Sequence, residues 1–455
     1  MASIIRRKSK YSVVYYYNDE NGEKRQRWET CNSHKEALRR KAEIENKIFE
    51  GVFIAPQAQT VSDFLWDFVH LYGEKKWGVS VYDSNTALIS NYINPIIGDL
   101  KVQDITPKYV DQFYQQLQKT KSVVSRNRKP RNEYVAPPTI EKIHKLLKCA
   151  FKQAVRWEMI ARNPFEFATI PKVTYKKRDI WTADNIRIAL DECREPKLYI
   201  AMNLAFACSL RIGEVLGLTW DNVHISNEDI QADNAHIFVE KELARASKQA
   251  MDALGDKEII KVFPSLYPNT STRLIFKTPK TDSSVRKVWL PKTVAYILRK
   301  WKQSQDELRE ILGEEYQDYN IVVAQPNGRP TENRLIEDAF VELKKRAGLP
   351  NVVFHSLRHS STTYKLKLNH GDLKATQGDT GHAQIDMITK VYAHILDEDR
   401  KINAQKFDMA FYKGPDLRKV EIPQDKAPTI DLQALVEQLK QSPELASTLA
   451  ALIAK

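Results

Sequence analysis

The sequence of 455 residues has no long apolar run. Its longest nearly apolar stretch, Ala201 to Leu210, is interrupted by Asn203 and is too short to cross a bilayer. The first residues are basic but lack the apolar core and cleavage pattern of a secretory signal. The four cysteines have no CxxC or Cys/His spacing, which argues against a disulfide framework and a structural zinc site. These absences set aside membrane and secreted classes and predict a cytoplasmic protein that holds no metal and needs no cofactor.

What the sequence does contain is an excess of positive charge. Apolar residues make up 42% and charged residues 28%, which is a globular composition of a length that suggests about two to four domains. The net charge is +12, and ten of these charges lie in residues 1–172. Such an excess is expected where a protein binds a polyanion, but a solvated basic surface without a partner has the same charge. Charge alone therefore leaves nucleic-acid binding open.

Residues 1–56 predict a small β-β-β-α module. Tyr11–Tyr17 and Lys24–Thr30 have the β-branched and aromatic composition of strands, and Ser33 with Glu36 forms a capping box for a following helix. One interpretation is an ordinary half-buried sheet. The other is a sheet face of aromatics and cations suited to a DNA groove, made of Tyr15, Tyr17, Arg25, Arg27 and Trp28.

Residues 59–171 predict an all-helical domain. Apolar residues recur at helical spacing in Val61–Tyr72, after Thr106-Pro107, and from Thr139 to Trp157. Before the last helix lies a loop with six cations and no acid. We favour phosphate binding over a merely solvated loop, because the neighbouring helices are also basic. The cations are Lys119, Lys121, Arg126, Arg128, Lys129 and Arg131.

Residues 179–413 mix helices with short strands and predict an α+β domain. The expected strands are Ala235–Glu240, Arg273–Lys277, Val285–Leu290 and Ile321–Ala324, and residues 242–270 look like an insertion between two of them. After a linker, residues 429–455 have leucines at the spacing of an amphipathic helix. The chain is thus expected to be multi-domain and mainly α with small β-sheets.

Three segments of the α+β region carry residues suited to chemistry on an anion. They are Ser209–Trp220, which contains Arg211; His355-Ser-Leu-Arg-His359; and Gly381-His382 followed ten residues later by Tyr392. Each signal is weak alone, since a lone arginine before a helix is usually structural and histidine–arginine pairs arise by chance. Together, in this order and spacing, they resemble the Arg…Lys…His-x-x-Arg…His…Tyr signature of the tyrosine recombinase (integrase) family.

The resemblance extends over roughly residues 1–412. It implies an N-terminal arm-type DNA-binding domain, a helical core-binding domain and a catalytic domain. TPKTDSSVRKVWLP resembles the segment that carries the family's lysine, which would be Lys280, with Lys277 close by. Glu214 matches an acidic position and is expected to orient Arg211 or Lys280. Thr380 stands where the family usually has leucine.

The implied chemistry suits these residue types. Arg211 and Arg358 can donate forked hydrogen bonds to the non-bridging oxygens of a phosphodiester. Tyr392 would be the nucleophile, with a catalytic set completed by Lys280, His355 and His382. His355 is the candidate base and Lys280 the candidate acid for the leaving 5′-oxygen. The resulting 3′-phosphotyrosine link conserves the bond energy, so neither ATP nor metal is required.

The expected function is therefore site-specific recombination by the integrase of a mobile element, through a Holliday junction. Expected partners are double-stranded DNA attachment sites, a homo-tetramer on two duplexes, and an excisionase or host DNA-bending factor, with no membrane contact. The expected location is the bacterial cytoplasm, at the nucleoid when DNA is bound. A type IB topoisomerase shares the catalytic set but not the N-terminal module. A non-catalytic DNA-binding regulator would have no physical reason to keep all six residues.

Overall fold

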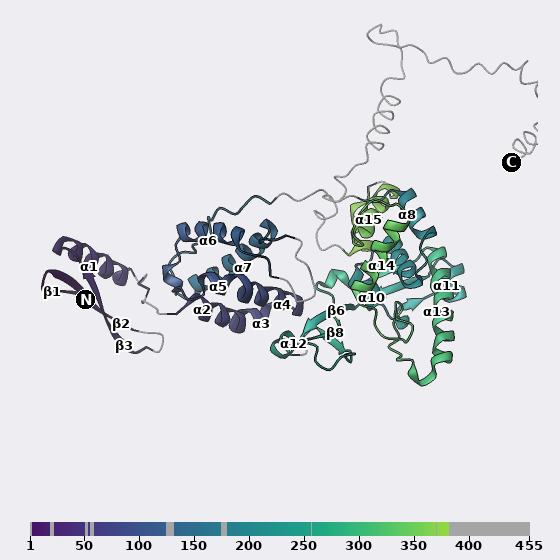
Figure 1. Cartoon of the computed structure of the whole chain (residues 1–455), viewed down its shortest axis with the longest axis horizontal. Coiled ribbons are helices and arrows are strands. Elements are labelled where there is room, and N and C mark those ends of the chain that lie inside the picture. The colour runs from purple at the N-terminus through teal and green to yellow at the C-terminus, as the bar shows by residue number, and fades with distance from the viewer. Residues whose placement is uncertain are drawn as a thin grey trace, which may run out of the picture. The chain divides into compact units, whose positions relative to one another are not determined.

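The structure, a computed structural model, describes residues 2–18, 22–50, 53–54, 59–123, 132–173, 180–255, 257–369 and 371–381 (Figure 1). The architecture is multi-domain and mainly α, with three small antiparallel sheets. No helix within these ranges is long and apolar enough to span a membrane. Several predicted features lie outside the described residues: Arg126, Arg128, Lys129, Arg131, His382, Tyr392 and the C-terminal helix at 429–455.

The N-terminal module is a three-stranded sheet, in the order β1-β2-β3, covered on one face by a helix. Its elements are β1 (Ser3–Arg7), β2 (Lys10–Asn18), β3 (Lys24–Cys31) and α1 (His34–Phe49). Ser33 caps α1 as predicted, accepting a hydrogen bond from the Glu36 N–H at 3.1 Å. Val13 and Tyr15 of β2 pack against Ala37 and Ile44 of α1 in a small apolar core. The opposite, open face exposes Tyr16 and Trp28, while Ser12 and Val14 on it are buried.

The helical region has its own large apolar core. Its helices are α2 (Val61–Phe68), α3 (Glu74–Lys76), α4 (Val79–Leu88), α5 (Asn94–Ile97), α6 (Pro107–Lys119) and α7 (Pro137–Arg156). Between them lie π-helical turns at Val69–Gly73 and Ile89–Ile93 and a 3-10 turn at Val102–Asp104. The predicted cap is confirmed, because Thr106 Oγ1 accepts a hydrogen bond from the Tyr109 N–H at 3.3 Å and Pro107 begins α6. Phe113 and Leu117 of α6 are fully covered.

The third region is built around α9 (Pro196–Ala207), which is buried on nearly all sides. This helix accounts for the longest apolar stretch of the sequence, since a helix that is apolar all round belongs in a core. Around it lie α8 (Ala183–Asp191), α10 (Ile212–Gly217), α11 (Asn227–Gln231), α13 (Lys292–Leu312), α14 (Asn333–Arg346), α15 (Ser356–Leu368) and α16 (Leu373–Thr380). Thr182 caps α8 as predicted. Three 3-10 turns complete the region, at Trp220–Asn222, Asp282–Ser284 and Gly313–Glu315.

Two three-stranded sheets flank this helical core. The first has the order β4-β5-β9, formed by β4 (Val223–His224), β5 (His236–Val239) and β9 (Arg286–Trp289). The second has the order β6-β8-β7, formed by β6 (Glu242–Ser247), β7 (Ile259–Val262) and β8 (Thr272–Lys277). Helix α12 (Lys248–Leu254) lies between β6 and β7 along the chain. The predicted insertion at 242–270 therefore supplies two strands and a helix that extend β8 into a sheet.

The insertion also contacts the helical region. Ala246, Ala250 and Leu254 are buried in the same apolar cluster as the helices from 61 to 156. Both Asp83 carboxylate oxygens accept hydrogen bonds from Ser247, from its backbone N–H at 3.0 Å and from its hydroxyl at 2.5 Å. Ser247 is the N-cap of α12, so one residue both starts this helix and contacts α4.

One predicted strand is wrong. Residues 321–324 are buried but form a turn with isolated bridges, Thr219 to Ile321 and Ala324 to Pro330. The carbonyl of Val322 accepts hydrogen bonds from the Trp301 indole at 2.7 Å and the Gln305 amide at 3.0 Å. Side chains of α13 thus take the place of a neighbouring strand. A short apolar run shows that a segment is buried, but it does not show how its backbone is paired.

Candidate active site

A sharp turn after α9 fixes the backbone that carries Arg211. Ser209 adopts φ 55°, a left-handed conformation that is unusual for a residue with a side chain. Its hydroxyl hydrogen-bonds with that of Ser361 at 2.6 Å, and its carbonyl accepts a hydrogen bond from Arg358. Arg211 then becomes the N-cap of α10, and its backbone N–H donates to the Glu214 carboxylate at 2.9 Å. The first arginine of the signature therefore extends from a backbone held by α15 and by Glu214.

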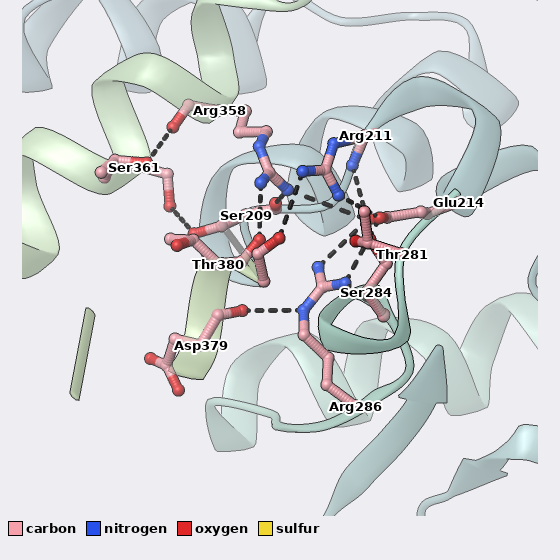
Figure 2. A network of polar contacts seen from close by, with 12 residues as sticks. Ser209, Arg211, Glu214, Thr281, Ser284, Arg286, Arg358, Ser361, Asp379 and Thr380 are labelled. Carbon is pink, nitrogen blue, oxygen red and sulfur yellow. Dashed lines mark hydrogen bonds and ion pairs between the residues drawn. The ribbon is translucent and has the colours of Figure 1, made fainter. Parts of the chain in front are cut away.

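Glu214 is the centre of a cluster of three arginines (Figure 2). Its carboxylate accepts hydrogen bonds from Arg211 Nη1 at 2.7 Å and from Arg286 at 3.0 and 3.3 Å, and it forms an ion pair with Arg358 at 3.8 Å. Burial would raise the pKa of this carboxyl, but the attraction and hydrogen bonds of Arg286, followed by those of Arg211, lower the pKa below its usual value. Glu214 is thus ionised, and it orients Arg211 as expected from the resemblance.

Arg358 is almost completely buried, at 1% exposure. Its guanidinium donates to the carbonyls of Ser209 and Thr380, which join α15 to the start of α10 and the end of α16. Burial and the repulsion of Arg211 lower the pKa of Arg358 to about 9, although Glu214 opposes this shift. Three guanidiniums share one carboxylate, so the cluster has an excess of two positive charges and can accept an anion.

The C-terminal end of α16 completes the cluster. Gly381 ends this helix at φ 62°, and its carbonyl accepts a hydrogen bond from Arg211 Nη2 at 3.2 Å. A Cβ at Gly381 would lie 3.0 Å from the Arg286 side chain, so glycine meets both a conformational and a spatial requirement. Thr380, in the place of the usual leucine, is buried and its hydroxyl donates to the Thr376 carbonyl at 2.7 Å. His382 follows directly in sequence.

The two candidate lysines differ in their surroundings. Lys277 is buried at the end of β8 and forms an ion pair with Glu242 at 2.6 Å. Lys280 is exposed in the connection between β8 and β9, next to Thr281. Thr281 hydrogen-bonds with Ser284 at 2.9 Å, and Figure 2 shows both beside the arginine cluster. Lys277 thus has a structural partner, and Lys280 stays the predicted lysine of the site.

His355 precedes α15 directly, at its N-cap, and lies one turn before Arg358. Its ring is edge-on to that of His359, with ring centroids 4.8 Å apart. The structure thus brings Arg211, Glu214 and Arg358 together, and it places His355 at the start of α15, the helix that carries Arg358. Within the described ranges, no group of three His, Cys, Asp or Glu side chains is placed to hold a metal ion.

Arg286 is a member of the cluster that sequence reasoning missed. It lies on β9, where inward residues Arg286 and Val288 alternate with outward Lys287 and Trp289. A charged residue at a buried position of a strand is rare without a partner. A charged residue at a strand position where an apolar one is expected was the one sequence signal of its role. This position lies within the segment already identified for Lys280.

The proposed DNA-binding face of the N-terminal module needs correction. Register pairs Tyr15 with Arg27, Tyr17 with Arg25, and Val14 with Trp28. Directly paired residues share a face, and neighbours in a strand alternate, so Trp28 lies on the face opposite the other four. Arg25 and Arg27 lie on the α1 side, where they form ion pairs with Glu23 at 2.7 Å and Glu29 at 3.9 Å.

The open face instead carries a different set of cations. Arg7 lies over the Trp28 ring at 4.6 Å, and Lys24 lies over the Tyr16 ring at 5.0 Å. In the helical region, the described members of the predicted basic loop, Lys119 and Lys121, are exposed.

The chain is similar to known integrases along most of its length. The Phage integrase family matches residues 180–399, and the Phage integrase SAM-like domain matches residues 60–173. A tyrosine recombinase XerC-like protein of Caldanaerobacter subterraneus subsp. tengcongensis is 24% identical over 85% of this chain and 92% of its own length. The ICEBs1 integrase of Bacillus subtilis is 22% identical over 72% of this chain and 77% of its own.

Among solved structures, an integrase of the transposon Tn1549 in complex with a circular intermediate DNA has the same fold, with a TM-score of 0.58. It is 17% identical, and the match covers 77% of this chain and 99% of that one. Both matched family regions, the relatives along most of the chain and the arginine cluster around Glu214 lead to one conclusion. The chain belongs to the tyrosine recombinase family, the enzymes that cleave DNA strands and transfer them to new ends.

Proposed function

We propose that the chain is the site-specific recombinase of a mobile element and that the arginine cluster binds the phosphodiester to be cut. The observation that carries this proposal is the excess of two positive charges around Glu214. Arg211 and Arg358 donate to the non-bridging oxygens, where charge develops as the phosphorus becomes five-coordinate. Such prearranged donors typically each contribute about 3 kcal/mol to transition-state stabilisation.

In this mechanism Tyr392 is the nucleophile. Its hydroxyl oxygen attacks the phosphorus and loses its proton to His355, while the bond to the 5′-oxygen breaks and Lys280 protonates that leaving group. The product is a 3′-phosphotyrosyl link and a free 5′-hydroxyl, so the number of phosphoester bonds is unchanged. A 5′-hydroxyl from the second duplex reverses the step and forms a Holliday junction. His382 donates a hydrogen bond to the phosphate.

Three domains divide the DNA contacts in this proposal. Residues 59–171 and 179–413 bind the core site, with Lys119 and Lys121 on the phosphate backbone. Residues 1–56 bind separate arm sites through the open sheet face, where Arg7 and Lys24 lie beside exposed Trp28 and Tyr16. Cations next to aromatic rings suit contact with phosphates and with the edges of bases.

We extend the proposal to a homo-tetramer on two duplexes in the bacterial cytoplasm. The leucine pattern of residues 429–455 provides an apolar face that can cover a neighbouring subunit. An excisionase or a host DNA-bending factor would set the direction of the reaction. The relatives' names, an integrase and a transposon integrase bound to a circular intermediate DNA, support an element-borne recombinase over a type IB topoisomerase or a silent regulator.

The test is covalent trapping on a nicked suicide site, taken from the DNA that flanks the coding region. The wild-type chain should form a protein–DNA band that survives denaturation. Tyr392→Phe should bind the same DNA without forming this band, because only the attacking oxygen is lost. A band that persists in Tyr392→Phe would place the nucleophile elsewhere, and relaxation of supercoiled DNA that carries no attachment site would favour the topoisomerase.

A further inference from the structure

Arg286 connects three segments that are far apart in the sequence (Figure 2). Two nitrogens of its guanidinium donate to the Glu214 carboxylate of α10, at 3.0 and 3.3 Å. Nη1 also donates to the Ser284 carbonyl, in the connection that carries Lys280, at 2.9 Å. Nε donates to the Asp379 carbonyl at the end of α16, just before Gly381, at 3.1 Å. These segments bear the first arginine, the lysine and the His382 position of the proposed catalytic set.

Only an arginine can make this set of contacts. The guanidinium presents five N–H donors in a rigid planar fork, whereas the lysine ammonium is a point charge with three rotatable donors. The Arg286 side chain is 6% exposed, so its charge is compensated by Glu214 rather than by water. A second ion pair, between Lys365 of α15 and the Asp379 carboxylate at 2.9 Å, also holds this end of α16.

We propose that Arg286 is a positioning residue for strand cleavage, acting on Arg211 through Glu214. With Arg286 in place, both Glu214 oxygens are fixed, and they in turn fix the backbone N–H and Nη1 of Arg211. The remaining Arg211 donors are then aimed at the phosphate before it binds. Without Arg286, the Glu214 carboxylate can rotate and Arg211 follows it. This inference rests on the phosphate-binding role proposed above for Arg211.

Single-turnover cleavage at saturating protein tests the proposal, with Arg286→Gln and Arg286→Lys. We expect Arg286→Gln to bind the core site as tightly as wild type but to cleave about 100-fold more slowly, the typical cost of losing one aimed donor. Arg286→Lys, which keeps the charge, should recover part of this loss. The matched control is Arg245→Gln, which should cleave like wild type. Arg245 is also a strand arginine, on β6 of the second sheet, and it forms an ion pair with Glu332 at 2.5 Å.

A DNA site with a methylphosphonate at the cleaved position separates positioning from a merely structural role, because a structural defect would slow cleavage of this site and of the ordinary site equally. This neutral group lacks one charged non-bridging oxygen, so an arginine aimed at that oxygen is no longer needed. On the diastereomer that rescues Arg211→Ala, the deficit of Arg286→Gln should shrink at least about tenfold. An unchanged deficit, or wild-type cleavage of the ordinary site by Arg286→Gln, would overturn the proposal.

Two further outcomes are distinguishable. If Arg286→Gln fails to fold, as judged by thermal unfolding, Arg286→Lys carries the same methylphosphonate comparison. If the wild-type chain forms no covalent complex, the proposed function fails rather than the role of Arg286. Wild-type cleavage with an intact Arg286→Gln rate contradicts only the positioning role.

Discussion

The cations of the N-terminal sheet and those of the catalytic cluster are the same kinds of residue in opposite surroundings. Arg7 and Lys24 lie over aromatic rings on an open face, whereas Arg286 and Arg358 are buried and bound to a carboxylate and backbone carbonyls. Exposed cations keep their hydration and adapt to many phosphate positions, so they supply salt-dependent affinity. Buried guanidiniums have lost that hydration before DNA arrives, so they can supply rate.

The largest expected effect is on the buried side of this comparison. Arg358→Lys keeps a positive charge but cannot donate to both the Ser209 and Thr380 carbonyls and still fork toward a phosphate. We expect cleavage to fall by about 100- to 1000-fold while binding of the core site changes little. Covalent-complex formation at saturating protein measures the fall in cleavage, and a filter-binding titration measures the affinity for the core site. Equal losses in both would mean that Arg358 acts in ground-state binding.

Glu214→Gln should lower stability by about 3–5 kcal/mol, because it leaves the buried Arg286 and Arg358 and the half-buried Arg211 without their carboxylate. Chemical unfolding followed by circular dichroism measures this difference.

The Glu214 carboxyl also predicts a dependence on pH. Its folded pKa lies below the usual value of 4.5, so its stabilising contribution is present above pH 4.5 and is lost as the pH falls through the folded pKa. The stability difference between wild type and Glu214→Gln should therefore be constant from pH 5 to 7 and shrink in stronger acid. A difference that grows in acid would show that other groups compensate the arginines.

The smallest effects are expected on the exposed side. Replacing Arg7 and Lys24 together by alanine should weaken binding to arm-type DNA and reduce the salt slope, log K against log salt, by about 2, one for each phosphate that is no longer neutralised. The matched control replaces Arg25 and Arg27, which lie on the α1 side and form ion pairs with Glu23 and Glu29. A larger loss of affinity in the control would restore the face predicted from sequence.

Local signals made much of the fold predictable. Ser33, Thr106 and Thr182 cap helices where the sequence indicated, because capping depends only on residues within one turn. That Tyr15 and Trp28 lie on opposite faces of the sheet was not predictable, because only the pairing register of the two strands shows which of their residues share a face.

The site shows the same division. Arg211, Glu214 and Arg358 could be found because their motifs are short and ordered along the chain. Arg286 could not, because its role arises from contacts with three segments that approach only in the folded protein. Contacts between residues far apart in the sequence produce no regular spacing from which they could be predicted.

The excess positive charge around Glu214 implies that DNA binding and the stability of the catalytic region are linked. The free enzyme holds three guanidiniums around one carboxylate, and burial together with the repulsion of Arg211 lowers the pKa of Arg358. Arg358→Met would remove the repulsion, but it would also remove the hydrogen bonds to the buried Ser209 and Thr380 carbonyls, so it should lower stability as well as abolish cleavage. Substrate DNA, which brings negative charge to the cluster, should therefore act as a thermal stabiliser of the catalytic region.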